Sequence, residues 1–238
     1  MRKKIFATLF ISMILCGGIK ADNTAATYGI TESDYESNIT KAKDGEEEAM
    51  LVVAKCYETG TGVKKDLKEA WRWYGKVAAE GNREADYIIG TLYRDGIGIK
   101  KNYEESAYWF RKAARNGHTE ALLNIAKQFE EGNGVLQDYR VAAENYWRAA
   151  ERGNAEAANR YAEMLRDGIG IAQDKSRALK YFKMAAEKDY PEAAYHAGLL
   201  ENEGVKMPVK STTKGKGAGA KTVKKQTTGK GAASNKKK

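Results

Sequence analysis

The chain is poor in histidine, cysteine and proline, with two of each among 238 residues. His118 and His196 have no Cys, Asp or Glu around them at the spacing of metal ligands, so we expect no metal site. Only Cys56 lies beyond residue 21, where we expect the chain to be cleaved, which leaves no internal disulfide to form. No GxSxG segment or Ser/His/Asp pattern supports a nucleophilic enzyme. We therefore expect no catalysis, no cofactor and no small-molecule substrate, and a hydrolase built on this chain is the least favoured alternative.

Long hydrophobic runs are also absent. The N-terminal run, residues 5–15, is eleven residues long, whereas a membrane-spanning helix needs about 18–20. It follows a basic start at positions 2–4 and precedes small residues ending at Ala21, a pattern that predicts a secretory signal peptide over residues 1–21. Export to the periplasm or the outside is then expected. Cys16 offers an alternative as a lipid-anchored cysteine, although the residue before it is bulky for that pattern.

Acidic residues are missing from residues 206–238, which contain eleven lysines. Between residues 21 and 205 the chain has 26 basic and 32 acidic residues, so this body carries about −6 and the tail +11. The Lys, Gly, Thr and Ala of the tail cannot form a core, and we expect disorder there. A near match to a phosphate-binding loop at residues 215–222 lacks the flanking strand and helix.

The tail is either a solvated extension or a flexible arm for nucleic acid or another polyanion. On the second interpretation its contact residues are Lys214, Lys216, Lys221, Lys224, Lys225, Lys230, Lys236, Lys237 and Lys238.

The body has an internal repeat of 36 residues. One series of glycines is Gly60, Gly96, Gly132, Gly168 and Gly204, and a second lies two residues later at Gly62, Gly98, Gly134 and Gly170. A repeated alanine stands at Ala49, Ala85, Ala121, Ala157 and Ala193. Several series in one register predict one supersecondary unit per period.

Each period predicts a helix, a turn and a second helix. Asn82 and Asn154 are good caps for the first helix, and the paired glycines suit its end. The second helix is capped by Asp66, Asn102, Asp138 and Asp174. Its inner face carries an aromatic residue that we assign to the core, namely Tyr74, Phe110, Tyr146 and Phe182.

Two helices cannot bury their apolar faces alone, so the units must stack. The prediction is an all-α protein, an α-α solenoid of four complete helix-turn-helix repeats at residues 45–80, 81–116, 117–152 and 153–188. An N-terminal segment with a capping helix precedes them at 22–44. A partial repeat follows at 189–205.

The pattern EAxxxxGxLYxDGxGxxxNYxxSxxWFRKAA, read over residues 84–114, resembles the Sel-one-like repeat, a relative of the tetratricopeptide repeat. This resemblance implies an α-α superhelix that scaffolds protein complexes, often as an exported bacterial protein. It also implies a concave groove lined by the first helices, where peptides or partner helices dock. Asn145 departs from the Trp or Tyr of the other units. The paired cysteines of one secreted branch are missing, so nothing known of that branch applies.

Three positions on each first helix, the second, sixth and ninth after the repeated alanine, are predicted to form a stripe away from the packed face. They vary in size and charge between units, so we expect them to bind a protein or peptide partner, with an ordinary solvated face as the alternative. The candidate partner-binding residues are Leu51, Lys55, Tyr87, Thr91, Arg94, Leu123, Lys127, Asn159 and Arg166. Glu58, Glu130 and Glu163 complete the stripe. Tyr87 and Leu123 are the expected apolar anchors, and a monomer is expected.

Overall fold

The computed structural model describes residues 30–208. The predicted signal peptide, Cys16 and the nine tail lysines lie outside the described residues. The described helices are α2 (Glu32–Lys43), α3 (Glu47–Thr59), α4 (Leu67–Ala79), α5 (Arg83–Asp95), α6 (Tyr103–Arg115), α7 (Thr119–Glu131), α8 (Tyr139–Glu151), α9 (Ala155–Asp167), α10 (Lys175–Ala186) and α11 (Pro191–Asn202). Residues 30–208 contain no strand, so the all-α prediction is confirmed.

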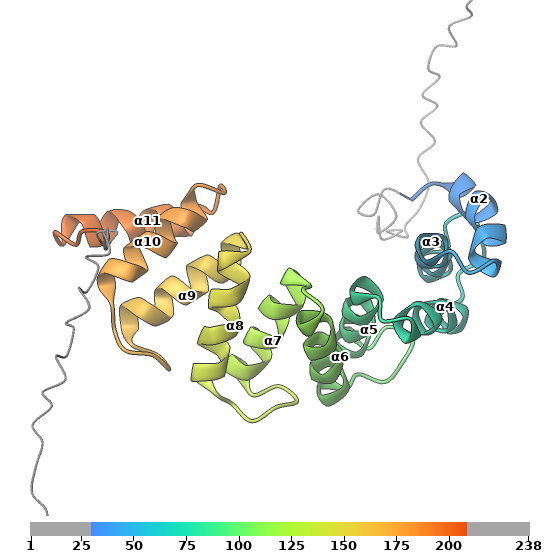
Figure 1. Cartoon of the computed structure of the whole chain (residues 1–238), viewed down its shortest axis with the longest axis horizontal. Helices are drawn as coiled ribbons and strands as arrows, with labels where there is room; N and C mark the ends of the chain where they lie inside the picture. The colour runs from blue at the N-terminus through green and yellow to red at the C-terminus, as the bar shows by residue number, and fades with distance from the viewer. Residues whose placement is uncertain (1–29, 209–238) are drawn as a thin grey trace, which may run out of the picture. The chain divides into compact units, whose positions relative to one another are not determined.

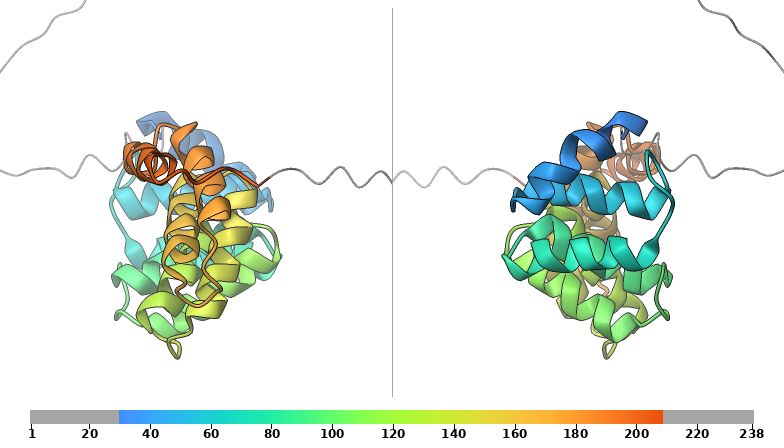
Figure 2. Two further views of the ribbon diagram at one scale, coloured as in Figure 1. Left: turned by 90° about the vertical axis from the view of Figure 1, so that its left-hand side faces the viewer. Right: turned by 90° about the vertical axis from the view of Figure 1, so that its right-hand side faces the viewer.

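Residues 30–207 belong to one compact unit, the repeat domain. Its first helices are α3, α5, α7 and α9, and its second helices are α4, α6, α8 and α10. Each helix packs mainly on its neighbours along the chain, and the pairs follow one another in a single row (Figure 1). The end-on views show the same stacking (Figure 2). The predicted solenoid is therefore confirmed, with α2 and α11 at its two ends.

Side-chain caps fix where the helices begin. Asp138 accepts hydrogen bonds from the backbone N–H groups of Arg140 and Val141 at 2.9 and 3.2 Å, and Asp66, Asn102 and Asp174 act likewise on their helices. Asn82 and Asn154 cap α5 and α9 as predicted. Such a cap satisfies a backbone donor that the helix itself leaves open.

The paired glycines end each first helix and bring the chain back. Gly132 ends α7 in the left-handed conformation with φ of 76°, which costs glycine little. Gly134 has φ of 70°, and a Cβ atom there would collide with the backbone of Tyr103 at the start of α6. The second glycine thus lets the turn of one repeat touch the second helix of the repeat before it.

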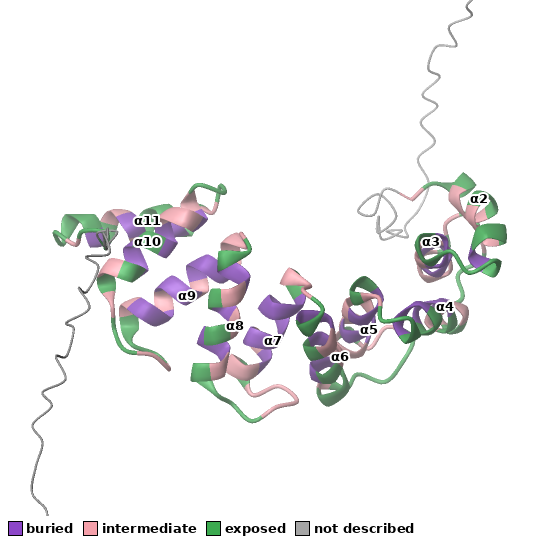
Figure 3. Cartoon of the chain, viewed as in Figure 1, coloured by how far each residue is buried: buried purple, intermediate pink, exposed green. Residues whose placement is uncertain are grey.

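The core runs between the helices along the whole row (Figure 3). Its largest buried side chains include Tyr74, Phe110, Tyr146 and Phe182, as predicted. Small residues of the first helix make room for these rings: a Cβ atom on Gly90 would lie 2.7 Å from the Phe110 ring. Among residues 30–208, no helix is long and apolar enough to cross a membrane.

Candidate partner-binding surface

The ninth residue after the repeated alanine, which we call position nine, contacts the buried aromatic residue of the second helix in the same repeat. In the first repeat the Tyr74 hydroxyl donates to the Glu58 carboxylate at 2.7 Å, and in the third Tyr146 donates to Glu130 at 2.6 Å. A buried hydroxyl needs a partner, and glutamate supplies the acceptor.

The second and fourth repeats use the other combination. Here the buried ring is phenylalanine, and the guanidinium carbons of Arg94 and Arg166 lie 6.0 and 5.9 Å from the ring centroids of Phe110 and Phe182. A phenylalanine needs no hydrogen-bond acceptor, and the face of an aromatic ring attracts a cation. The alternation of charge along the row therefore accompanies the alternation of the ring behind it, and packing gives a second reason for the variation at the ninth residue after the repeated alanine.

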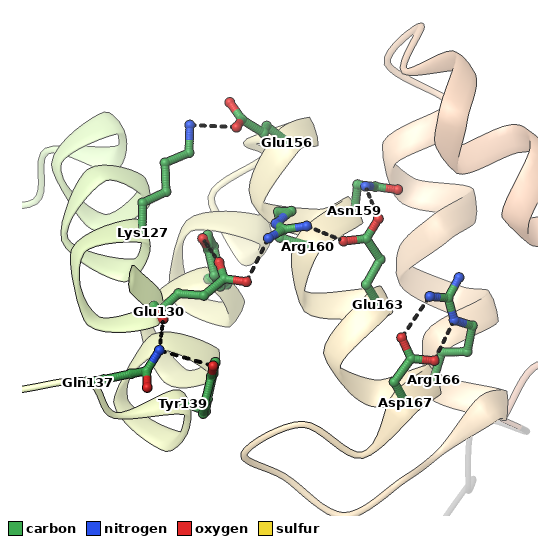
Figure 4. Close-up of polar contacts among 11 residues, drawn as sticks. Lys127, Glu130, Gln137, Tyr139, Glu156, Asn159, Arg160, Glu163, Arg166 and Asp167 are labelled. Carbon is green, nitrogen blue, oxygen red and sulfur yellow. Dashed lines mark hydrogen bonds and ion pairs between the residues drawn. The ribbon is translucent and has the colours of Figure 1, made fainter. Parts of the chain in front are cut away.

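Polar contacts also join the first helices of successive repeats. Arg94 donates to Asn124 at 2.6 Å, linking α5 to α7. Arg160 pairs with Glu130 at 2.6 Å, linking α9 to α7 (Figure 4). At the next junction the two interacting residues are Arg166 and His196, at 3.2 Å. The same two repeat positions, the ninth after one repeated alanine and the third after the next, are therefore in contact at three consecutive junctions between repeats.

The contacts around Glu130 shift the pKa values of its neighbours. Burial and then the hydrogen bond to Glu130 raise the pKa of the Tyr146 hydroxyl. Burial works to lower the pKa of Arg160, but the Glu130 and Glu163 carboxylates outweigh it, so the net shift is upward. The hydroxyl therefore stays neutral and the guanidinium stays charged.

The stripe is less open than predicted. Leu123 is 4% exposed, Asn159 1% and Lys55 9%, so the expectation that these three side chains face away from the packed side is wrong. Leu123 belongs to the hydrophobic core, and Lys55 and Asn159 each donate a hydrogen bond to a glutamate of their own helix. Tyr87 is half-buried, and its ring stacks on His118, the cap of α7, with centroids 4.2 Å apart.

The polar stripe residues of the third and fourth repeats are held in polar pairs (Figure 4). Lys127 forms an ion pair with Glu156 at 2.6 Å, and Asn159 donates to Glu163 at 3.0 Å. Arg166 binds its neighbour Asp167 at 2.7 Å. The structure does not bring these residues together with the stripe residues of the first two repeats.

The first junction differs from the other three. The two positions that carry the polar contact elsewhere hold Glu58 and Ile88 here, and an isoleucine cannot form that contact. A cavity of about 680 Å³, which we call the α3–α5 groove, lies at this junction. It gathers six stripe residues, namely Leu51, Lys55, Glu58, Tyr87, Thr91 and Arg94.

Apolar residues that the stripe did not include also line the α3–α5 groove. They are Ile30, Val52, Ile88, Leu92 and Ile97. Ile88 could have been found from the sequence, because its counterparts in the repeats that follow are the polar residues Asn124, Arg160 and His196, and only Val52 before it is apolar as well. Ile30 carries no such signal, since it precedes the first repeat. Among residues 30–208, no group of three or more His, Cys, Asp or Glu is placed to hold a metal ion.

The stacked helix pairs with their paired-glycine turns define a helical repeat protein. The sequence profile of the Sel1 repeat matches residues 47–82, 83–118, 119–154 and 155–190, and the chain belongs to this family. No curated protein sequence matches it significantly.

Two solved structures share the fold. The protective antigen c5321 of uropathogenic Escherichia coli, which displays an SLR fold, is 28% identical with a TM-score of 0.70 over 73% of this chain. A Sel1 repeat protein from Oxalobacter formigenes is 35% identical with a TM-score of 0.61 over 66% of this chain. The chain spans only 37% and 64% of the lengths of these two proteins. Sel1 repeat proteins generally mediate protein–protein interaction and are typically scaffolds without enzyme activity.

Proposed function

We propose that this protein is an exported interaction scaffold that holds a segment of a protein partner in the α3–α5 groove. The observation that carries the proposal is the first junction between repeats. Glu58 and Ile88 stand there in place of the polar pair of the other junctions, and six stripe residues line the α3–α5 groove at the same place. Family membership supports the general role, because Sel1 repeat proteins bind protein partners.

The lining defines the chemistry of the segment. Leu51, Val52, Ile88 and Ile97 offer apolar surface. Lys55, Glu58 and Arg94 supply charged groups that are already hydrogen-bonded. A partner gains most here by burying large apolar side chains, at about 25 cal/mol per Å² removed from water. We therefore expect an extended or helical peptide segment with one or two such side chains.

A groove-filling variant tests the proposal. Thr91→Trp places an indole in the α3–α5 groove, and Lys127→Trp places the same side chain at the same repeat position between α7 and α9, outside it. In affinity capture from the native envelope, Thr91→Trp should reduce recovery of the specific partner at least about tenfold, whereas Lys127→Trp should not. Equal recovery with both variants, each with unchanged helicity, would exclude the groove.

Export rests on the N-terminal pattern and has its own test. Intact-mass analysis of the protein from the native host should show a chain that begins at Asp22. A lipid-modified Cys16 at the N-terminus would instead establish the anchored form. A chain that retains Met1 would contradict export by this signal.

The lysine-rich tail is strongly positive, whereas the body is negative. This difference favours a second function, in which the tail binds nucleic acid or another polyanion. Lysines without aromatic neighbours favour non-specific, salt-sensitive contact. The affinity for a mixed-sequence DNA duplex should fall steeply with salt, and a chain ending at Val205 should lose it. Retention of DNA binding after this truncation would place the contact on the repeat domain.

A further inference from the structure

In the second repeat a small residue of the first helix stands opposite the aromatic residue of the second helix, because Gly90 lies against the Phe110 ring. The small residues at this position are Ala54, Gly90, Ala126 and Ala162, and all are buried. The aromatic residue lies twenty positions later in each repeat and is also fully buried.

Helix α11 repeats the first-helix pattern but has no such cover. Gly198 occupies the position of Gly90, and no described atom lies within 4 Å of a Cβ atom built on it. Ala194 is exposed, although its counterparts Met50, Asp86, Leu122 and Ala158 are all buried. The α11 notch around Gly198 therefore lacks the ring that fills this place in the other repeats.

Large apolar side chains flank this notch. Tyr195 is 65% exposed and Leu199 43%, and the exposed side of the helix carries no charge from Ala194 to Leu199. The opposite side is buried through Ala193, Ala197 and Leu200. A helix that is apolar on both sides is normally covered on both, and the terminal unit of a solenoid normally has a polar outer face. Figure 3 shows the exposed stretches on α11.

The described chain does not supply the missing helix. In the repeat register the aromatic position falls at Ala218, and residues 211–222 contain no aromatic residue. The equivalent position of α2 is Asn38, so the capping helix of a second copy lacks the ring as well. The second helices α4, α6, α8 and α10 already have their aromatic residues buried in their own repeats.

We propose that the open face of α11 binds, in trans, an amphipathic helix of a partner protein that carries the second-helix pattern. That pattern is a small residue, an aromatic residue four positions later and another small residue four after that, as in Ser106, Phe110 and Ala114. The aromatic ring enters the notch at Gly198, and the flanking small residues allow close approach to Tyr195 and Leu199. This contact continues an interface that the repeat domain already forms four times.

The proposal is independent of the α3–α5 groove, because that groove lies at the first junction and α11 follows the last complete repeat. Its probe is a fluorescein-labelled peptide of residues 102–116, whose Phe110 is the ring that packs on glycine within the chain. Titrated with the full chain, this peptide should bind saturably, and a Phe110→Ala peptide should bind at least about tenfold more weakly.

Matched variants of the protein locate the contact. Gly198→Leu fills the notch and should weaken binding at least about tenfold, without loss of helicity because leucine favours a helix over glycine. Gly75→Leu is the control, since Gly75 is a helical glycine that, like Gly198, has no described atom within 4 Å of its Cβ position. It should bind the peptide as the unchanged chain does. Thr91→Trp should also leave binding unchanged, which separates this face from the α3–α5 groove.

Three results would overturn the proposal. The first is no binding up to about 1 mM peptide, or equal binding by Gly198→Leu and Gly75→Leu. The second is loss of peptide binding in Thr91→Trp, which would place the peptide in the groove. The third is a concentration-dependent dimer in sedimentation that Gly198→Leu abolishes, which would make the occupant a second copy.

Discussion

At the scale of single residues, the first helices follow a rule that links two positions sixteen residues apart. Tyr74 and Tyr146 stand behind Glu58 and Glu130, whereas Phe110 and Phe182 stand behind Arg94 and Arg166. A buried phenol requires an acceptor, whereas a phenylalanine needs none and its ring face can lie next to a cation. In both combinations position nine contacts the buried ring, with a negative side chain beside tyrosine and a positive one beside phenylalanine.

Removing one of these hydroxyls tests the rule. Tyr146→Phe deletes the 2.6 Å bond to Glu130 and keeps the ring. A hydrogen bond to a charged group contributes about 1.5–3 kcal/mol, and Glu130 keeps its pair with Arg160, so a loss of about 1–2 kcal/mol is expected in urea unfolding. Tyr108→Phe, at an exposed position, should change the free energy of unfolding by less than about 0.5 kcal/mol. Equal effects of the two variants would show that the bond contributes little.

The stability at high pH should depend on Tyr181. Burial and then the hydrogen bond to Glu151 raise the pKa of its hydroxyl to about 12, above about 10 in the unfolded chain. The neutral form is the one that folding favours, so this contribution is complete below pH ~10 and is lost as the pH rises toward ~12. The free energy of unfolding of Tyr181→Phe, measured across this range, should fall less steeply than that of the unchanged chain. Parallel curves would contradict the assignment.

The sequence predicted much at this scale, but not the stripe. The caps Asp138 and Asn154 and the buried ring of Tyr146 follow from local rules that depend only on spacing. The burial of Leu123 and Asn159 does not, because it depends on tertiary packing, which the spacing along a single helix does not define. The link between the ninth residue after the repeated alanine and the ring behind it was not predicted, because the fold alone shows that these two positions are in contact.

At the scale of helices and turns, the two glycines of each paired-glycine turn have different structural roles. Gly132 requires a left-handed backbone, and the nearest atom to a Cβ there is Gln137 Cβ at 3.4 Å, an ordinary contact. Gly134 requires the same backbone and also faces the main chain of Tyr103. The second glycine is therefore a contact between repeats as well as a turn.

Alanine at each glycine should separate the two roles. Gly132→Ala adds only left-handed strain, which costs about 1–2 kcal/mol. Gly134→Ala adds the same strain and forces the turn away from α6, so its cost should exceed that of Gly132→Ala by at least about 1–3 kcal/mol. Thermal and urea unfolding of the two variants measure the difference. Costs equal within error would mean that the turn can shift without disturbing the repeat before it.

At the scale of the whole repeat domain, the main contacts join helices that follow one another in the chain. Repetition explains why the fold was predictable. The same helix pair recurs along the chain, and no prediction of contacts between distant segments is needed. The α3–α5 groove was not predictable in the same way. It arises where Ile88 breaks the repeated pattern and where Ile30, outside the repeats, adds to the lining.

A row of this kind should open from its ends. Helix α2 buries only Ala42 and packs mainly on α3, whereas α7 and α8 each bury five or more residues and have neighbours on both sides. Stability in a solenoid is close to a sum of units and their interfaces, so local opening is cheapest where one interface is missing. Native-state hydrogen exchange should show α2 exchanging first and α7 and α8 last.

The same experiment can test how far a local change spreads along the row. Tyr146→Phe removes a bond between α8 and α7, so exchange should accelerate in α7, α8 and the adjoining α9. Amides of α3 and α4, two repeats away, should keep their protection, because coupling passes only through successive interfaces. If every helix from α2 to α11 exchanged at one common rate and responded equally to the substitution, the repeat domain would unfold as a single cooperative unit. Interface energies would then exceed the stability differences between repeats, and neither end of the row would open independently.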